Sequence, residues 1–357
     1  MQTFAYAFES SDVLIQIGEV LMAKYTTLKD VAELAGTTTG TVSYVLNGKQ
    51  DRYISDDIRQ RVLKAAKELN YIKCNGASSL KGKANKLIGI LIPQFENQFF
   101  TRIVMAAEDI FVKQGFDMII CDTYDDPERE REIIRRLIAQ RVDGIIVTPT
   151  KKGAENTALL REIGMKMVVV DRPLDGIDNY YWVTTNNYGC GEKGMQYLLS
   201  KGHKKVGYVG WNSGIADLDA RKKAIFDVSK NKAEVHVVEG GISATQGYEL
   251  TKRLLSEHPD ISAIFFGFNI QAKGGVDAIV EMGLRIPDDI SVLLIGTPEW
   301  SYTGMNNFTC VAMNDVELGK TAAKVLLDQI QNVPLEPQRF IHDCFIKEGR
   351  SILDKEE

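Results

Sequence analysis

Residues 27–47 read TLKDVAELAGTTTGTVSYVLN and predict two short helices joined by a tight turn. Thr27 can cap the first helix, and Gly36 ends it because glycine readily adopts the conformation that closes a helix. The pair Thr37-Thr38 then supplies a cap for the helix that follows. Two short helices joined at a glycine are typical of a helix-turn-helix.

A third helix is expected from Ser55, which can cap it, to Asn70. Its apolar residues return at the spacing of one helical face. These residues are Ile58, Val62, Ala65, Ala66 and Leu69. The three helices form either a DNA-binding headpiece or a small three-helix bundle with a polar surface, and the spacing alone leaves both open.

The charge of the chain is divided between its two parts. Residues 22–86 hold 12 Lys and Arg against 6 Asp and Glu, whereas residues 87–357 hold 31 against 39. The whole chain of 357 residues carries a net charge of −5. A basic module on an acidic body indicates either a polyanionic partner at one end only or a solvated basic face, and it does not distinguish DNA from RNA.

In a helix-turn-helix the second helix enters the major groove, where its first outward residues meet the base edges. Thr and Ser can hydrogen-bond to bases, and a threonine methyl can contact the methyl group of thymine. The candidate DNA-binding residues are Thr27, Thr38, Thr39, Gly40, Ser43, Tyr44, Asn47 and Leu80. Leu80 is included because it is an isolated large apolar side chain in a short basic segment, which could place it between base steps of the minor groove.

From Leu87 onward, short apolar runs alternate with amphipathic helices. Buried parallel strands read as unbroken apolar runs, and the strand-helix-strand order implies doubly wound sheets. The expected strands are residues 87–92, 118–121, 144–148, 167–170, 205–209, 234–238, 263–266 and 291–295. They are too many for one compact sheet, so we expect two lobes. The chain is expected to cross between them near residues 183–186 and 311–314, and finally near residues 334–338, which would carry residues 340–346 into the second lobe.

Ligands of such sheets bind at the carboxyl ends of the strands, and between two lobes those ends face one cleft. The loops at these ends supply carboxylates, guanidinium groups, an amide and aromatic rings. The candidate ligand-binding residues are Phe99, Phe100, Asp171, Arg172, Asp217, Arg221, Phe268, Asn269 and Trp300. Each could instead have a structural role, and Arg172 could brace the lobes through an ion pair.

The composition is that of a globular protein, with 44% hydrophobic and 25% charged residues. Its apolar runs are too short to cross a bilayer, so we expect no membrane partner. Five cysteines without a Cys-x-x-Cys pair and four scattered histidines predict a reducing compartment and no metal site. Acidic residues between Asp125 and Glu132 alternate with arginines, which predicts a solvated, ion-paired helix face.

The stretch Gly189–Gly194 matches the G-x-G-x-x-G pattern of dinucleotide sites. Such a site needs an acidic residue at the end of the next strand, and that strand ends without one. We therefore expect no dinucleotide cofactor. The sequence also contains no P-loop pattern and no G-x-S-x-G pattern, so we expect no cofactor of any kind and no catalytic residues. Residues 1–21 lack the basic start of a secretory signal, and Met22 is a plausible first residue. They are expected to be a non-native or disordered extension, or else a short N-terminal helix.

Three ordered blocks, residues 27–47, 68–71 and 77–83, resemble the DNA-binding headpiece and hinge helix of the lactose-repressor (LacI) family. The body is similar to the effector domain of the same family, which is like the periplasmic sugar-binding proteins. The matching stretches include residues 97–100, 141–146, 170–173, 201–206 and 283–292.

The resemblance implies an N-terminal all-α helix-turn-helix headpiece and an α/β body of two doubly wound parallel-sheet lobes, of the periplasmic-binding-protein type. The expected domains are the extension 1–21, the headpiece 22–72, the hinge helix or linker 73–86, an N-lobe of residues 87–185 and 314–335, and a C-lobe of residues 186–313 and 336–354.

The resemblance also implies a cytoplasmic, homodimeric repressor that binds double-stranded operator DNA and is controlled by a small-molecule effector, a sugar or another ring-containing metabolite. Carried over to this chain, the implied effector contacts are Phe99, Phe100, Asp171, Arg221, Asn269 and Asp217. The chain departs from the family at Asn269, where Asp is common, and at residues 296–299, which lack the usual Gly-Phe-Asp-Asp. The alternative is a cytosolic small-molecule binding protein or an enzyme with an accessory basic domain.

Overall fold

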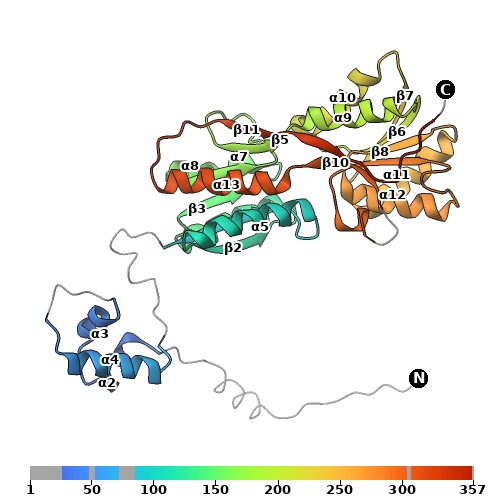
Figure 1. Ribbon diagram of the computed structural model, residues 1–357. Coiled ribbons are helices and arrows are strands. Elements are labelled where there is room, and N and C mark those ends of the chain that lie inside the picture. Colours follow the sequence, from blue (N-terminus) through green and yellow to red (C-terminus); the bar gives the residue numbers. More distant parts are fainter. Residues whose placement is uncertain (1–25, 48–52, 72–84, 304–306, 356–357) are drawn as a thin grey trace, which may run out of the picture. The chain divides into compact units, whose positions relative to one another are not determined.

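The computed structural model describes residues 26–47, 53–71, 85–303 and 307–355 (Figure 1). Contacts divide the chain into two compact units, residues 1–83 and 84–357. The predicted extension at residues 1–21, the predicted wedge Leu80 and nearly all of the predicted hinge segment lie outside the described residues.

The first unit, the headpiece, contains α2 (Leu28–Leu34), α3 (Thr39–Leu46) and α4 (Asp56–Glu68), which confirms the three predicted helices. Thr27, Thr38 and Ser55 cap them, each accepting a hydrogen bond from a first-turn backbone N–H at 3.3, 3.2 and 3.5 Å. The apolar faces meet in a small core that includes the fully buried Val31 and Val62. The apolar faces that the spacing predicted therefore form the core that stabilises this unit.

The second unit, the body, contains two six-stranded sheets, and the sheet nearer the start of the chain defines the N-lobe. Its order is β11-β5-β4-β3-β1-β2, with every pair parallel. The strands are β1 (Leu87–Ile92), β2 (Asp117–Asp122), β3 (Gly144–Val147), β4 (Lys166–Val170), β5 (Trp182–Thr185) and β11 (Arg339–His342). The helices are α5 (Gln98–Lys113), α6 (Pro127–Ala139), α7 (Gly153–Asn156), α8 (Ala158–Glu162) and α13 (Asp315–Ile330).

The second sheet defines the C-lobe and has the order β12-β10-β9-β8-β6-β7, in which β12 alone is antiparallel to its neighbour. The strands are β6 (Lys205–Trp211), β7 (Glu234–Gly240), β8 (Ala263–Phe266), β9 (Ser291–Ile295), β10 (Thr309–Met313) and β12 (Cys344–Lys347). The helices are α9 (Asn187–Ser200), α10 (Ala216–Ser229), α11 (Ala244–Glu257), α12 (Asn269–Glu281) and the 3₁₀ turn η3 (Glu299–Ser301). The predicted pair of doubly wound lobes is confirmed.

The last crossing between the lobes differs from the prediction. Residues 336–354 were expected in the C-lobe, but β11 pairs with β5 in the N-lobe, with Phe340 opposite Val183. The chain therefore crosses at Asp343, between β11 and β12. The physical reason is that β5 has a free edge, which β11 fills through backbone bonds such as Asn186 N to His342 O at 2.8 Å. A short apolar run does not reveal which open sheet edge it will cover.

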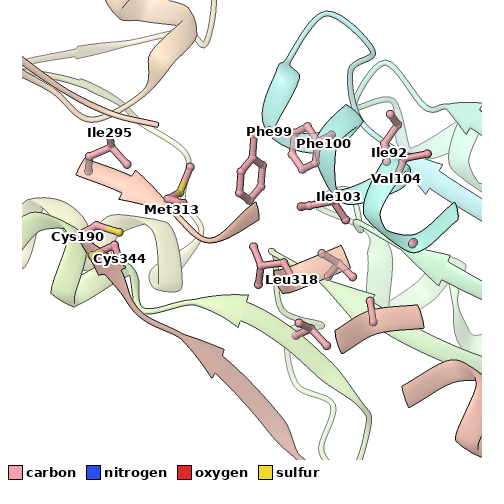
Figure 2. Close-up of a cluster of buried hydrophobic side chains, with 14 of the residues drawn as sticks. Ile92, Phe99, Phe100, Ile103, Val104, Cys190, Ile295, Met313, Leu318 and Cys344 are labelled. Atoms are coloured by element: carbon pink, nitrogen blue, oxygen red, sulfur yellow. The ribbon is translucent and has the colours of Figure 1, made fainter. Parts of the chain in front are cut away.

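Buried side chains from both lobes meet in one hydrophobic cluster (Figure 2). In the figure, Phe99 lies between Ile103 and Leu318 of the N-lobe and Met313 of the C-lobe. The start of α5 therefore contributes to the junction between the lobes. Among the described residues, no helix combines the length and apolar character that crossing a bilayer requires.

Candidate functional site

The carboxyl ends of strands from both lobes surround a cavity of about 50 Å³. Seven of the nine predicted ligand-binding residues line it: Phe99, Phe100, Asp171, Arg172, Arg221, Phe268 and Asn269. Pockets that enclose drug-sized ligands measure roughly 300–1,000 Å³, so a metabolite needs the lobes to separate or side chains to move. The site is a closed cleft of the kind that the strand order predicted.

Two predicted residues do not line the cavity. Asp217 lies in the first turn of α10, where its carboxylate pairs with Arg339 and accepts a hydrogen bond of 2.6 Å from Asn187 Nδ2. Trp300 packs edge-on against Phe308 in the C-lobe, with ring centroids 5.6 Å apart. Asp217 therefore links α10 to the N-lobe strand β11, and Trp300 belongs to the core of the C-lobe.

Asp171 follows β4 and has a buried carboxyl group that faces the cavity. Its backbone has a φ of 65°, and its carbonyl oxygen accepts hydrogen bonds from Thr184 Oγ1 at 2.9 Å and Trp182 Nε1 at 3.3 Å. No group in the described ranges donates a hydrogen bond to its carboxylate. Burial raises the pKa of this carboxyl, and the neighbouring Arg172 and Arg221 offset part of that rise.

Arg172 is a buried guanidinium group next to Asp171. Its Nη1 pairs with Asp125 and donates to the carbonyl of Pro149 at 3.4 Å, and the group lies 5.4 Å from the centroid of the Trp211 ring. Its buried Nε has no hydrogen-bond partner among the described residues. The predicted bracing ion pair exists, but it lies within the N-lobe rather than between the lobes.

Arg221 on α10 is also buried and has an acceptor for each of its three nitrogen atoms. Nε donates to Asn187 Oδ1 at 2.8 Å, Nη1 to the carbonyl of Gly267 at 2.8 Å, and Nη2 contacts Met313 Sδ at 3.5 Å. The guanidinium group also lies 4.8 Å from the centroid of the Phe268 ring. Arg221 therefore ties together elements of the C-lobe as well as lining the cavity.

Several cavity residues were not predicted, and they are Gln94, Asn97, Trp211, Leu218, Ile242, Ile295 and Met313. Trp211, Ile295 and Met313 end strands, so the rule on carboxyl ends could have identified them. Leu218 lies in the stretch from Trp211 to Arg221 that follows β6, so the same rule points to it. The sequence held no signal for Ile242, because which further loop closes the cleft depends on how the lobes pack.

Hydrogen bonds join the two lobes around the cavity. Asn269 Nδ2 donates to Asn97 Oδ1 at 3.1 Å, and Gln98 Nε2 donates to Glu299 Oε2 at 3.1 Å. Arg102 donates to Thr297 and to Tyr302, both at 3.0 Å. Within the described part of the chain, no group of three or more His, Cys, Asp or Glu side chains is placed to hold a metal ion.

The candidate DNA-binding residues cluster on and around α3. Thr39 and Gly40 are exposed at its first turn, and Ser43 and Tyr44 are half-buried one turn later. Asn47 is exposed at its end and donates to Ser43 Oγ at 3.1 Å. Thr27 and Thr38 are exposed as well, but their hydroxyl groups serve as helix caps. Six of the eight residues thus lie on α3 or at its two ends, Thr27 caps α2, and Leu80 lies outside the described residues.

Comparisons with known proteins match both units. Residues 27–73 match the bacterial regulatory proteins of the lacI family, and residues 88–333 match a periplasmic binding protein domain. The chain is 32% identical over 341 residues to the transcriptional repressor PurR of Escherichia coli O139:H28, an alignment that covers 92% of this chain and 97% of PurR. It is 29% identical over 316 residues to the ribose operon repressor of Halalkalibacterium halodurans, covering 88% of this chain and 93% of that repressor.

The fold is also that of the lac repressor dimer bound to operator and the anti-inducer ONPF, with a TM-score of 0.78 and 24% identity over 92% of this chain and the whole of that one. The relatives regulate transcription and are not enzymes. The helix-turn-helix headpiece, the two-lobed cleft and these matches over nearly the whole chain lead to one conclusion: the chain belongs to the lacI family of bacterial regulatory proteins.

Proposed function

We propose that the chain acts in the cytoplasm as a homodimeric repressor whose headpiece binds double-stranded operator DNA under the control of a small metabolite in the cleft. The relatives that are transcriptional repressors, and the lac repressor dimer on its operator, support this proposal. In it the headpiece covers residues 22–72, and residues 73–86, nearly all of which lie outside the described residues, join it to the body.

The observation that carries the DNA-binding role is the surface of α3. Its Val42 and Val45 are buried in the headpiece core, whereas Thr39 and Gly40 stand exposed at its first turn. That end of a recognition helix is the part that meets base edges. Thr38 fixes where the helix begins, because its hydroxyl accepts from the backbone N–H of Thr41 at 3.2 Å.

Fluorescence anisotropy with DNA from upstream of the gene tests the role, using salt titrations and unrelated DNA as competitor. We expect a steep loss of affinity with salt and a preference for one sequence, as regulators show. Thr39→Ala should weaken specific binding by about 5- to 150-fold, which corresponds to about 1–3 kcal/mol for a base contact. Glu68→Gln on α4, at an exposed position, is the matched control and should bind normally. Equal affinity for all sequences would contradict the proposal.

We propose the cleft as the effector site because two of its buried groups have unused hydrogen-bonding capacity. The Asp171 carboxylate can accept from a ligand, and Arg172 Nε can donate to one. Phe99 and Phe268 add apolar surface that can pack on a ring. Asp217 and Trp300 are not part of this proposed site.

A second copy of the chain is proposed to pack against α5 and β2. Met105 and Val112 lie one above the other on α5 with 65% and 59% of their surface exposed, and β2 is an edge strand with Ile120 exposed. Such an apolar face marks an interaction surface. Sedimentation equilibrium should show a dimer, and the double variant Met105→Lys/Val112→Lys should shift it to monomer. A monomeric native protein would contradict this part of the proposal.

A further inference from the structure

The helix α3 lacks the side chains that identify bases through pairs of hydrogen bonds. Guanine is read in this way by Arg or Lys and adenine by Asn or Gln, while Asp or Glu accepts from cytosine. Between Gly36 and Asn47 the chain has no charged residue and no Gln, and its one amide is that of Asn47. The Nδ2 atom of Asn47 already donates to the carbonyl of Ser43 at 2.5 Å and to Ser43 Oγ at 3.1 Å. With these bonds in place, α3 offers no paired amide donor and acceptor to a base.

The exposed start of α3 instead carries a side chain with one hydroxyl group and one methyl group. Thr39 is exposed there, one turn before the half-buried Ser43. A hydroxyl group both donates and accepts, so it can bond to any base edge and discriminates weakly. The methyl group has an apolar counterpart on one base only, the C5 methyl of thymine in the major groove. The methyl group of Thr39 is therefore the part of this side chain that can distinguish bases.

Gly40, the next residue, has no reason within the headpiece to be a glycine. It lies inside α3, and a Cβ added there would meet only Thr38 Oγ1, at 3.8 Å, among the described residues. Alanine would also favour the helix more than glycine does. Because Gly40 is exposed, its missing side chain leaves open surface where another molecule can come close to the backbone.

We infer that α3 recognises a thymine of the operator through its C5 methyl group, which packs against the methyl group of Thr39. The bare backbone at Gly40 permits the close approach that this contact needs. The inference rests on the DNA-binding function proposed above, and it names the base that the operator contains opposite the start of α3. Removing one methyl group from such a contact should weaken binding about fourfold, the equivalent of about 0.8 kcal/mol.

Substitution of single thymines tests the contact from the DNA side. The full chain first selects its site from random DNA duplexes, and its affinity is measured by fluorescence anisotropy at fixed salt. Each thymine of the site is then replaced in turn by deoxyuridine, which lacks only the C5 methyl group. We expect about fourfold weaker binding at one thymine of each half-site.

Variants of Thr39 test the same contact from the protein side. Thr39→Ser removes the methyl group and keeps the hydroxyl group, so it should weaken binding to the thymine duplex by a similar factor. It should show no further loss with deoxyuridine, because both changes remove one contact. Thr39→Val keeps a methyl group and should keep the sensitivity to deoxyuridine. Thr26→Ser is the matched control outside α3 and should also keep that sensitivity.

Gly40→Ala tests the close approach separately. The added Cβ has room in the free headpiece, so circular dichroism should show unchanged or higher thermal stability. In the complex the same atom should meet the DNA, and we expect about 5- to 150-fold weaker binding to the selected site. Binding as tight as that of the native chain overturns the inference.

The remaining outcomes separate this inference from the function on which it rests. A selected site in which no thymine is sensitive to deoxyuridine overturns the inference, as does a full deoxyuridine effect in Thr39→Ser. Both results leave the DNA-binding role intact, because the chain still selects one sequence. A selection that yields no preferred sequence overturns the proposed function itself.

Discussion

Glu130 is a buried carboxylate that ties α6 to the segment after β3. It is fully buried and accepts hydrogen bonds from Thr150 N at 2.9 Å, Thr150 Oγ1 at 2.7 Å and Asn156 Nδ2 at 2.5 Å. The same segment carries Pro149, whose carbonyl accepts a hydrogen bond from Arg172, a residue that lines the cavity. Replacing Glu130 should therefore destabilise the body and also disturb a cavity that it does not line.

The loss of stability on replacing Glu130 can be judged from the hydrogen-bond donors that are left without an acceptor. Glu130→Ala leaves three buried donors without an acceptor, and a donor left in this way costs about 1–3 kcal/mol. Water that enters the space left by the side chain can bond to some of these donors and lower the combined cost. We therefore expect the free energy of unfolding to fall by about 3–5 kcal/mol, as when one partner of a buried charged network is removed. Glu130→Gln keeps the volume and one acceptor oxygen, and it should cost about half as much.

Urea unfolding followed by tryptophan fluorescence measures this change in the body alone, because all three tryptophans lie at positions 182, 211 and 300. Glu132→Ala is the matched control, since Glu132 is exposed on the same helix and should change the stability by less than about 0.5 kcal/mol. If Glu130→Ala unfolds at the same urea concentration as Glu132→Ala, the hydrogen-bond argument is refuted.

Four further predictions test other parts of the structure. Burial lowers the pKa of His203 to about 4, below its unfolded value of about 6.5, so the body should lose stability as the pH falls from 6.5 towards 4, and His203→Gln should show a smaller loss in pH-dependent urea unfolding. Gly194→Ala would place its Cβ 2.3 Å from Phe265 Cζ and should cost about 1–3 kcal/mol in the same assay. Thr38→Ala should cost the headpiece about 1 kcal/mol through loss of a helix cap, measured by circular dichroism. Arg339→Ala removes the partner of Asp217 and should increase hydrogen exchange at the cleft, and unchanged exchange would count against a link between the lobes.

The sequence was informative where one physical rule dominates. The caps Thr27, Thr38 and Ser55 lie where local chemistry placed them, because a cap depends only on neighbouring residues. The positions of Asp171 and Asn269 followed from the rule that parallel strands present their carboxyl ends to one edge. These features could be predicted without knowing how distant parts of the chain pack.

The errors arise where packing between distant segments decides. Glu130 was expected on a solvated face because arginines flank it, yet α6 turns it inwards towards Thr150 and Asn156. Asp217 was expected in the cavity, but it pairs with Arg339 instead. Arg339 belongs to β11, which we predicted in the C-lobe but which lies in the N-lobe sheet. Both errors have the same cause. The pattern of charges along a helix does not reveal which side chains from other elements will pack against it.

The way the lobes are joined bears on how an effector could act. The three crossings are tied to one another: Asn186 Nδ2 donates to Asp343 Oδ1 at 2.9 Å, and Asn314 Nδ2 donates to the carbonyl of Asp343 at 2.6 Å. Other bonds between the lobes, such as Gln98 with Glu299, are exposed and can be exchanged for bonds to water at a net cost of about 0.5–1.5 kcal/mol each. Separation of the lobes should therefore pivot on the crossings and break the exposed bonds. Since a coupling of about 1–3 kcal/mol is typical between an effector and a distant site, two or three such bonds are enough to set its size.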